Sequence, residues 1–339
     1  MPSPPLAAPN TLKILIVGVG SIGERHLRCF KNTGRCEVAF CETNPSLRAE
    51  VADRYGCPGF EDLEEALHTG IFSAAVICTP APSHVPIAIK CVDAGLHVLI
   101  EKPLSTCSEG VDELIAMAQK ANIEVRVAYI YRFLSAIRRA KELLSLGQCG
   151  LIRQVVVTSG QHFPSFRPAY RTIYYAKRES GGGAIQDALT HQIHAIEWLV
   201  SPAASVTCQA AHQVLEGVEV EDTVNLSLRL RDGTLASFAL NQFQVINETV
   251  ITFHGTNGSL RIELPSNRVG LVLRGEDTWN WEQLPPTERD IPFTDQALDF
   301  LGLLTGQVSH ASSLSEAKQT LMANLAALQS DTANQGVDI

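Results

Sequence analysis

The stretch that decides the fold reads Gly18-Val19-Gly20-Ser21-Ile22-Gly23. An apolar run at residues 12–17 precedes it and a helical pattern follows it, so the glycines lie at a strand-to-helix turn. In such a turn the first glycine permits the bend, the second lets a pyrophosphate approach the backbone, and the third lets helix and strand pack closely. The N-terminus of the helix then binds the anion. The stretch predicts a dinucleotide site formed by Gly18, Gly20, Ser21, Ile22 and Gly23.

An acidic residue follows at the spacing that this type of site requires. Glu42 comes 19 residues after Gly23, at the end of the next apolar run, residues 37–41. A carboxylate there can accept hydrogen bonds from the ribose hydroxyls and repels a 2'-phosphate. Strand, helix and acid together disfavour a chance glycine turn, and they predict NAD as the cofactor in preference to NADP.

The composition is that of a soluble globular protein with more than one core. The chain has 339 residues, of which 45% are hydrophobic and 19% charged, and no apolar run is long enough for a membrane helix. We interpret the proline-rich residues 1–10 as a disordered leader and not a signal peptide. Nine scattered cysteines without a CxxC pair suggest reduced thiols and a cytoplasmic location. The net charge of -9 disfavours nucleic acids and anionic membranes as partners.

The first part of the chain alternates short apolar runs with helical patterns, as a doubly wound parallel sheet requires. We expect strands at residues 12–17, 37–41, 73–78, 97–100 and 123–128, and helices at residues 21–32, 45–55, 62–67, 83–94 and 108–121. Residues 11–130 would form this NAD-binding domain. Its ligand would lie beyond the carboxyl ends of the strands.

The pattern changes in the second part, residues 131–339. We expect helices at residues 135–146, 184–200, 295–304 and 313–330, a strand at residues 151–159, and alternating strands at residues 223–230, 234–244, 248–254, 259–264 and 269–273. Two hairpin turns, Asp232-Gly233 and Asn257-Gly258, connect some of these strands. The pattern predicts an α/β domain with an open, mostly antiparallel sheet.

Two strand ends bring polar groups to the predicted crevice. Thr79-Pro80 and Glu101-Lys102-Pro103 each follow an apolar run. Pro103 fixes the backbone after Lys102, so the ammonium would extend across the crevice at low entropic cost. A solvated surface lysine is the alternative. His26 and His84 are also expected near the crevice, as packing or lining residues.

A second group of residues follows three glycines, Gly181 to Gly183. Asp187 and His191 are four residues apart and so share one face of the predicted helix. A histidine with a carboxylate neighbour is suited to proton transfer, because the acid orients the ring and tunes its pKa. The alternative is a first-turn acid beside a packed histidine. With His194 on the same side, the pair could also hold a metal, although the sequence nominates no rigid further ligand and we expect none.

The segment before the glycines, residues 163–178, contains five aromatic and four cationic residues. We call it the lid segment. Aromatic rings stack on sugar faces and arginine binds carboxylate or phosphate, so the segment resembles a lid over a hydroxylated anionic ligand. An exposed basic loop is the alternative. The residues predicted to contact substrate here are Arg167, Tyr170, Arg171 and Tyr174.

Taken together, these motifs resemble the Gfo/Idh/MocA family, which is named after glucose-fructose oxidoreductase, inositol dehydrogenase and a rhizopine-catabolism protein. The resemblance spans nearly the whole chain from Leu12. It rests on the glycine turn, on Ile77-Cys78-Thr79-Pro80 with His84, on Ala94-Gly95-Leu96-His97-Val98 leading to Glu101-Lys102-Pro103, on Tyr131-Arg132-Phe133, and on Gly181-Gly182-Gly183 through Asp187 to His191. The family often has aspartate at the position of His194 and proline at that of Ser135.

The resemblance implies a Rossmann domain, a substrate domain whose open sheet mediates a homodimer or homotetramer, and hydride transfer between nicotinamide and a sugar or cyclitol. Lys102, Asp187 and His191 would be catalytic and would contact substrate, as would Arg132. His191 would act as the general base on oxidation. Thr79, Pro80, His84, Glu101 and Lys102 would join Glu42 at the cofactor. A weaker similarity points to acidic or nucleotide sugars.

We therefore predict an NAD-dependent oxidoreductase that acts on a secondary alcohol carbon. Two alternatives stay open at this point. One is an NAD-binding sensor or scaffold without catalysis. The other is a metal-assisted hydrolase or lyase that uses Asp187, His191 and His194.

Overall fold

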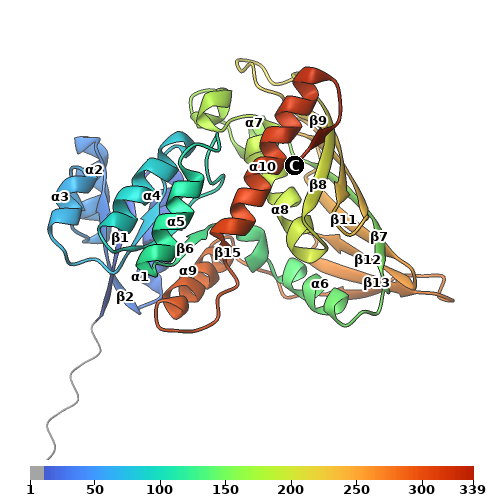
Figure 1. The fold of residues 1–339 in the computed structure, drawn as a ribbon, viewed down its shortest axis with the longest axis horizontal. Coiled ribbons are helices and arrows are strands. Elements are labelled where there is room, and N and C mark those ends of the chain that lie inside the picture. The colour runs from blue at the N-terminus through green and yellow to red at the C-terminus, as the bar shows by residue number, and fades with distance from the viewer. Residues whose placement is uncertain (1–10) are drawn as a thin grey trace, which may run out of the picture.

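The computed structural model of the protein describes residues 11–339, which form two α/β units side by side (Figure 1). The predicted leader, residues 1–10, lies outside the described residues. One unit is built around a largely parallel sheet and the other around a larger, mostly antiparallel sheet. The predicted fold class is therefore confirmed.

The first sheet has the strand order β15-β6-β5-β4-β1-β2-β3. Its parallel strands are β1 (Leu12–Val17), β2 (Cys36–Cys41), β3 (Gly59–Phe60), β4 (Ala74–Ile77), β5 (His97–Ile100) and β6 (Val125–Val127). The antiparallel strand β15 (Ser312–Ser313) extends one edge. The strand order reverses between β1 and β4, which is where a doubly wound sheet binds its ligand. The sequence pattern missed β3 and β15 because each has only two residues.

Helices cover both faces of this sheet because its strands are apolar on both sides. Leu15 packs in one core cluster, while Ile14 and Ile16 pack in the cluster on the opposite face, and all three are fully buried. The helices are α1 (Ser21–Asn32), α2 (Pro45–Tyr55), α3 (Leu63–His68), α4 (His84–Asp93) and α5 (Val111–Ala121). Each agrees with an expected helix to within a few residues at its ends.

The C-terminal part of the chain returns to the first unit. Helix α9 (Ile291–Leu303) packs on α1, with the rings of Phe30 and Phe300 edge to face at 6.3 Å. Helix α10 (Leu314–Ala333) passes between the two units (Figure 1). The division near residue 130 stays a prediction, and these contacts indicate that the last 50 or so residues join both units.

The second sheet has the order β14-β13-β12-β11-β7-β10-β9-β8-β16. Its strands are β7 (Ile152–Gly160), β8 (Ala203–Ala211), β9 (Thr223–Leu230), β10 (Leu235–Asn241), β11 (Glu248–Gly255), β12 (Gly258–Glu263), β13 (Arg268–Leu273), β14 (Asn280–Gln283) and β16 (Val337–Asp338). Neighbours pair antiparallel except β7 and β10, which run parallel. The pattern missed β8, β14 and β16.

One face of this sheet is covered and the other is open. Helices α6 (Ser135–Ser145), α8 (Thr190–Leu199) and α10 lie against the covered face (Figure 1). The strands alternate accordingly: Val224, Leu226 and Leu228 of β9 point inward and are 1–2% exposed. Short helices lie in the connections: η1 (Ala81–Ser83), η2 (Ile130–Phe133), α7 (Phe163–Phe166), η3 (Tyr174–Ala176) and η4 (Arg178–Ser180).

The helix expected at residues 184–200 is not a single α-helix. It begins as a π-helix, η5 (Ile185–Leu189), and continues as α8. A π-turn has a wider backbone spacing than an α-turn, and such segments are frequent at functional sites. Asp187 therefore lies on η5 and His191 on α8, which changes how the two side chains face each other.

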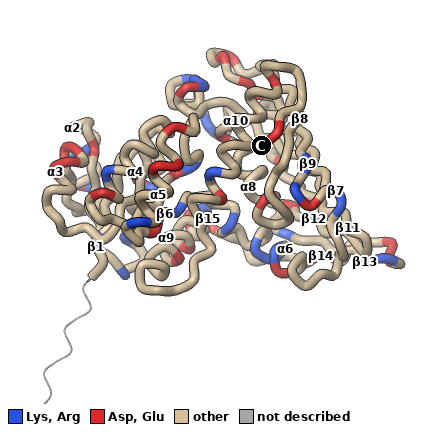
Figure 2. The backbone as a smooth tube through the Cα atoms, in the orientation of Figure 1, with Lys and Arg blue, Asp and Glu red and all other residues tan. Residues whose placement is uncertain are grey.

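Two surface properties bear on the predicted partners. Basic and acidic residues are interspersed along the described part of the chain in both units (Figure 2). Within residues 11–339, no helix has the length and apolar character needed to cross a membrane.

Candidate active site

The glycine turn joins β1 to α1 and has the geometry that its sequence predicts. Gly18 has a φ of +84°, which an L side chain rarely adopts. A Cβ on Gly23 would lie 1.9 Å from the Gly18 carbonyl oxygen, so helix and strand pack closely only with glycine there. Gly20, in contrast, has open space around it, and it precedes a helix with no side-chain cap. Ser21 and Ile22 follow as the first residues of α1.

Glu42 lies directly beside this turn. Its Oε2 accepts a hydrogen bond from the Val19 backbone at 3.1 Å, and its Oε1 accepts one from the Asn44 backbone at 2.9 Å. The uncapped N-terminus of α1 and the open space at Gly20 match the pyrophosphate of NAD. The fixed Glu42 carboxylate matches its ribose hydroxyls. The residues present therefore fit this cofactor.

Thr79 and His84 form the neighbouring wall of the crevice. The Thr79 methyl group lies 3.2 Å from the position of a Cβ on Gly18. The His84 ring is 1% exposed, and its nitrogens lie 2.8 Å from the Thr79 carbonyl and 2.9 Å from the Pro103 carbonyl. Burial lowers the pKa of His84. Both nitrogens face backbone carbonyls, and the single N–H of the neutral ring can be donated to only one of them. His84 therefore lies between the loops of Thr79 and Pro103, and its place at the cofactor stays a prediction. Pro80 leads from Thr79 into η1.

Glu101 also connects two segments, helix α1 and the loop of Lys102. One carboxylate oxygen lies 2.7 Å from His26 Nε2 on α1, and the other accepts the Lys102 backbone N–H at 3.0 Å. Burial raises the pKa of Glu101, but the contact with His26 and the charge of Lys102 outweigh it and the net shift is downward. Glu101 thus ties the lysine loop to the helix of the glycine turn, which places it behind the cofactor crevice. The sequence indicated His26 as a packing or lining residue near the crevice.

Lys102 and Asp187 bring the two units together. The Lys102 ammonium lies 2.9 Å from both Asp187 Oδ1 and the Asp187 carbonyl oxygen, and Tyr174 donates its hydroxyl to Oδ1 at 2.6 Å. Burial alone would raise the pKa of Asp187. The charges of Lys102 and Arg167 and the Tyr174 hydrogen bond together hold it well below its usual range. Asp187 therefore stays ionised while being only 5% exposed.

His191 lies beside this cluster as a neutral ring. It stacks on Tyr131 with centroids 5.1 Å apart and meets the edge of Tyr129 at 6.1 Å. Burial and the nearby Lys102 charge hold the pKa of His191 well below its usual range, although Asp187 acts in the opposite direction. Nδ1 is buried without a hydrogen-bond partner among the described residues. Tyr131, which only the Tyr131-Arg132-Phe133 motif signalled, is thus part of the site.

No hydrogen bond joins Asp187 to His191 among the described residues. The acid binds Lys102 and Tyr174, and it reaches His191 only through its charge. The physical reason is the π-turn between them together with the stronger attraction of an ammonium for a buried carboxylate.

His194 is part of the packing between units and not of a metal site. Its Nε2 accepts a hydrogen bond from Arg132 Nε at 2.9 Å, its Nδ1 lies 2.9 Å from the Thr320 hydroxyl, and its ring stacks on Tyr129 at 3.8 Å. A metal ligand needs a free ring nitrogen. Over residues 11–339, no group of three or more histidine, cysteine or acidic side chains is placed to hold a metal. The metal-assisted alternative therefore has no structural support.

Arg132 does not have the position expected of a substrate ligand. The side chain is 4% exposed and donates to His194, to the His310 carbonyl at 3.3 Å and to Glu316 at 2.7 Å. A buried guanidinium requires such partners. The carboxylate that neutralises Arg132 comes from Glu316 on α10.

The lid segment is divided between two roles. Tyr174 reaches the Lys102–Asp187 cluster, and the charge of Arg167 acts on both Asp187 and His191. Arg167 forms no salt bridge within residues 11–339. Tyr170 and Arg171 instead anchor the lid, since both donate to the Glu216 carbonyl, at 2.9 and 2.8 Å. Their expected substrate contacts are therefore not supported.

The close packing of neighbouring segments requires glycine before Asp187. A Cβ on Gly182 would lie 2.1 Å from the Tyr175 carbonyl oxygen, and one on Gly183 would lie 2.4 Å from the Glu221 carboxylate. Gly181 faces the first unit, near Ala81 and Pro103. The crowding at Gly182 and Gly183 comes from neighbouring backbone and from Glu221.

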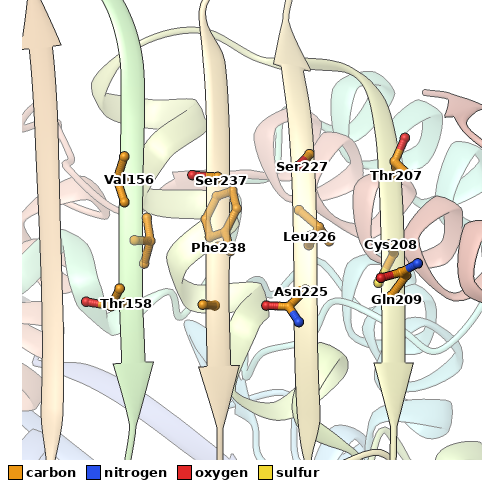
Figure 3. A pocket seen from close by; sticks show the side chains of 12 residues that line it. Val156, Thr158, Thr207, Cys208, Gln209, Asn225, Leu226, Ser227, Ser237 and Phe238 are labelled. Carbon is orange, nitrogen blue, oxygen red and sulfur yellow. The ribbon is translucent and has the colours of Figure 1, made fainter.

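A shallow pocket of about 450 Å³ lies elsewhere, on the second sheet. Figure 3 shows it across β7, β10, β9 and β8, lined by side chains such as Thr158, Ser237, Asn225 and Thr207. Cys208 is its only titratable lining residue, and burial raises the pKa of Cys208 to about 12. The pocket therefore lacks the groups that the Lys102–Asp187–His191 cluster brings together, and it is not the candidate active site.

Two family models match this chain. Residues 12–129 match the model described as "Oxidoreductase family, NAD-binding Rossmann fold", and residues 137–261 match the "GFO/IDH/MocA C-terminal domain". The two ranges correspond to the two units of the structure.

Similar proteins agree with these matches. Levoglucosan dehydrogenase of Pseudarthrobacter phenanthrenivorans is 27% identical over 74% of this chain and 73% of its own length. Inositol 2-dehydrogenase of Corynebacterium glutamicum is 26% identical, over 79% of this chain and 80% of its own. The solved structure of WlbA dehydrogenase from Bordetella pertussis, with NADH and UDP-GlcNAcA, has a TM-score of 0.84 and 24% identity over 97% of this chain and 99% of its own.

Proposed function

Because the chain belongs to the Gfo/Idh/MocA family of NAD-dependent oxidoreductases, we propose that it oxidises a secondary alcohol carbon of a sugar, an acidic or nucleotide sugar, or a cyclitol. Levoglucosan, inositol and a nucleotide sugar acid occur in the names of its relatives and structural neighbours. The family, the enzyme class and the cofactor agree with the sequence-based predictions. The substrate class and the residue roles below are the proposal.

One observation carries this proposal. The Lys102 ammonium, at the end of β5 in the cofactor-binding unit, lies 2.9 Å from Asp187 of the second unit, and the neutral His191 ring lies beside them. A cation, an ionised acid and a neutral base are the groups that alcohol oxidation needs next to a nicotinamide site. They meet because the loop after β5 in the first unit contacts η5 in the second.

Each residue has a distinct role in this proposal. Lys102 stabilises negative charge as it develops on the substrate oxygen. His191 accepts the hydroxyl proton at Nε2, because Nδ1 is buried. Asp187 fixes the lysine and stays ionised, so it can accept a hydrogen bond from a second substrate hydroxyl. NAD, when bound, supplies the acceptor for the hydride that leaves the carbon.

Arg167 supports an anionic group on the substrate. Its charge reaches the site, and its guanidinium has no carboxylate partner among the described residues. Tyr174 of the same lid segment donates its hydroxyl to Asp187, which fixes the lid segment to the site. A carboxylate or phosphate on the substrate would supply the partner that Arg167 lacks.

Assembly and location are part of the same proposal. The open face of the second sheet presents small and polar side chains, among them Thr158 and Ser237, over a broad area (Figure 3). We propose that this face packs against a second copy in a homodimer or homotetramer. All nine cysteines are free thiols, which supports a reducing, cytoplasmic location.

The experiment that tests the function is a screen for NADH formation at 340 nm. Cyclitols, anhydrosugars, uronic acids and nucleotide sugar acids are each offered with NAD to the wild-type protein and to the Lys102→Met variant. We expect at least one compound to be oxidised by the wild type, with turnover lowered by roughly 100-fold or more in the variant. NAD binding without turnover of any compound would favour the sensor alternative. Equal turnover by the variant would contradict the role of Lys102.

A further inference from the structure

Glu221 lies outside the residues that touch the cofactor or substrate, yet it contacts the start of the helix that carries Asp187. It is 3% exposed and directly precedes Asp222 and strand β9. Its carboxylate Oε1 accepts the Ile185 backbone N–H at 3.1 Å, and its carbonyl oxygen accepts the Ala184 N–H at 2.9 Å. Glu221 therefore satisfies two N–H groups at the beginning of η5, where a helix has no partners of its own.

The same carboxylate also binds the end of the lid segment. Arg178 donates to Glu221 Oε2 at 3.0 Å, and the Arg178 side chain is 46% exposed while that of Glu221 is 3%. The Gln186 side chain, next to Asp187, donates to the Arg178 carbonyl at 3.0 Å. One buried acid thus connects the lid with the first turn of η5.

The glycines between Arg178 and Asp187 show how closely this contact is made. Gly183 has a φ of +91°, and a Cβ there would lie 2.4–2.7 Å from the Glu221 carboxylate. The Gly183 carbonyl in turn accepts the Asp187 N–H at 3.0 Å. The backbone that leads to Asp187 is therefore pressed against Glu221, and its path depends on the position of that carboxylate.

From these contacts we propose that Glu221 is a positioning residue, which holds Asp187 opposite Lys102. Because Glu221 also binds Arg178, the position of Asp187 depends on the lid segment being packed against Glu221. The inference rests on the proposed function only in assigning Asp187 to the reaction. Its structural half, that Glu221 holds the start of η5, stands independently of any substrate.

The test begins with hydrogen exchange followed by mass spectrometry on the full-length protein. Glu221→Gln keeps the shape of the side chain and removes its charge. The matched control is Glu216→Gln, which removes an acid that pairs with Arg171 in the same lid but is 88% exposed and does not contact η5. We expect exchange in peptides covering residues 184–189 to rise at least fivefold in the first variant and to stay at the wild-type rate in the control. Equal exchange in the two variants would overturn the proposal whatever the enzyme oxidises.

The second part uses the compound that gives most NADH in the screen. We expect Glu221→Gln to lower kcat about tenfold, with the Kd for NAD within twofold of wild type. In a protein that already carries Asp187→Asn, the same change should lower kcat by less than twofold, because the residue acts through Asp187. A tenfold loss in both backgrounds would identify an independent structural effect and overturn the proposal. Arg178→Gln, which alters a half-exposed side chain, should also lower kcat, but by less. An unchanged kcat would contradict the claim that the position of Asp187 depends on the lid segment.

Discussion

Asp187 and His191 lie four residues apart on one helical segment, but no hydrogen bond joins them among the described side chains. Asp187 accepts hydrogen bonds from Lys102 and Tyr174, while His191 stacks on Tyr131. The two groups are therefore held in different states, an ionised acid and a neutral ring. This separation suits a site in which one group fixes a cation and the other receives a proton.

The first prediction concerns His191. Replacing it with alanine should lower kcat by about 100- to 10,000-fold, because general-base catalysis contributes that much. The Kd for NAD should change little, since the ring lies beside Asp187 and Tyr131 and not at the glycine turn. His310→Ala serves as a control, because this histidine is exposed. Turnover of the His191 variant at the wild-type rate would refute its assignment.

Cofactor choice is predicted to depend on Glu42. Its carboxylate is fixed beside the glycine turn by the Val19 and Asn44 backbones. Changing it to glutamine should weaken NAD binding by roughly 10- to 100-fold, the usual range for a lost charged hydrogen bond. The ratio of Kd values for NADP and NAD, measured by calorimetry, should fall in the variant. Tighter binding of NADP than of NAD by the wild-type protein would be incompatible with this account.

The two lid arginines offer a matched comparison. Arg167→Ala should raise the KM for a carboxylated or phosphorylated substrate about tenfold or more, because a charge-assisted contact is lost. Arg171→Ala should leave it near the wild-type value, since Arg171 binds the Glu216 carbonyl away from the site. Steady-state kinetics on neutral and anionic substrates separates the cases. An equal change in KM for the anionic substrate in the two variants would contradict the role of Arg167 in binding the anion.

Acid should destabilise the protein below pH 6.5. Burial lowers the pKa values of His84, His191 and His194 from 6.5, so between 6.5 and those lower values the unfolded chain binds protons that the folded protein does not. As the pH is lowered through this range, the free energy of unfolding decreases by about 1.4 kcal/mol per pH unit for each such proton. The pKa of Asp187 is lowered from 3.8, so its contribution is lost only below that pH.

Thermal unfolding measured from pH 8 to pH 5 checks this pH dependence. The Tm should be nearly constant above pH 6.5 and should fall progressively below it. In a His194→Asn variant the fall should be shallower, because one of these three histidines is absent. A Tm that stays constant from pH 6.5 to pH 5 would contradict the neutral state of these rings.

The sequence was most informative where the local pattern alone determines the structure. The glycine turn with Glu42, the parallel strands and the strand-end position of Lys102 follow from hydrophobic runs and turn chemistry over short distances. Lys102 and Asp187 were each identified, and the structure adds that they bind each other. That contact joins residues 85 positions apart and depends on how the two units pack.

The sequence was least informative about polar side chains whose partners come from distant segments. Arg132 was expected at the substrate but is neutralised by Glu316, 184 positions later, and donates a hydrogen bond to His194. Tyr170 and Arg171 were grouped with Tyr174, yet only Tyr174 faces Asp187, because the other two are bound by Glu216. The π-turn at residues 185–189 has no pattern that distinguishes it from an α-helix. The sequence therefore did not indicate that Asp187 would bind Lys102 and Tyr174 and act on His191 only through its charge.

Hydride transfer from a carbon atom to the cofactor is the central claim, and an isotope measurement tests it most directly. The best compound from the screen is prepared with deuterium at its carbon-bound positions and incubated with the wild-type protein and NAD. Mass spectrometry of the product should find NADH one mass unit heavier than normal, and the His191→Ala variant should form it about 100- to 10,000-fold more slowly. NADH of normal mass, or product formed without any NADH, would contradict the account.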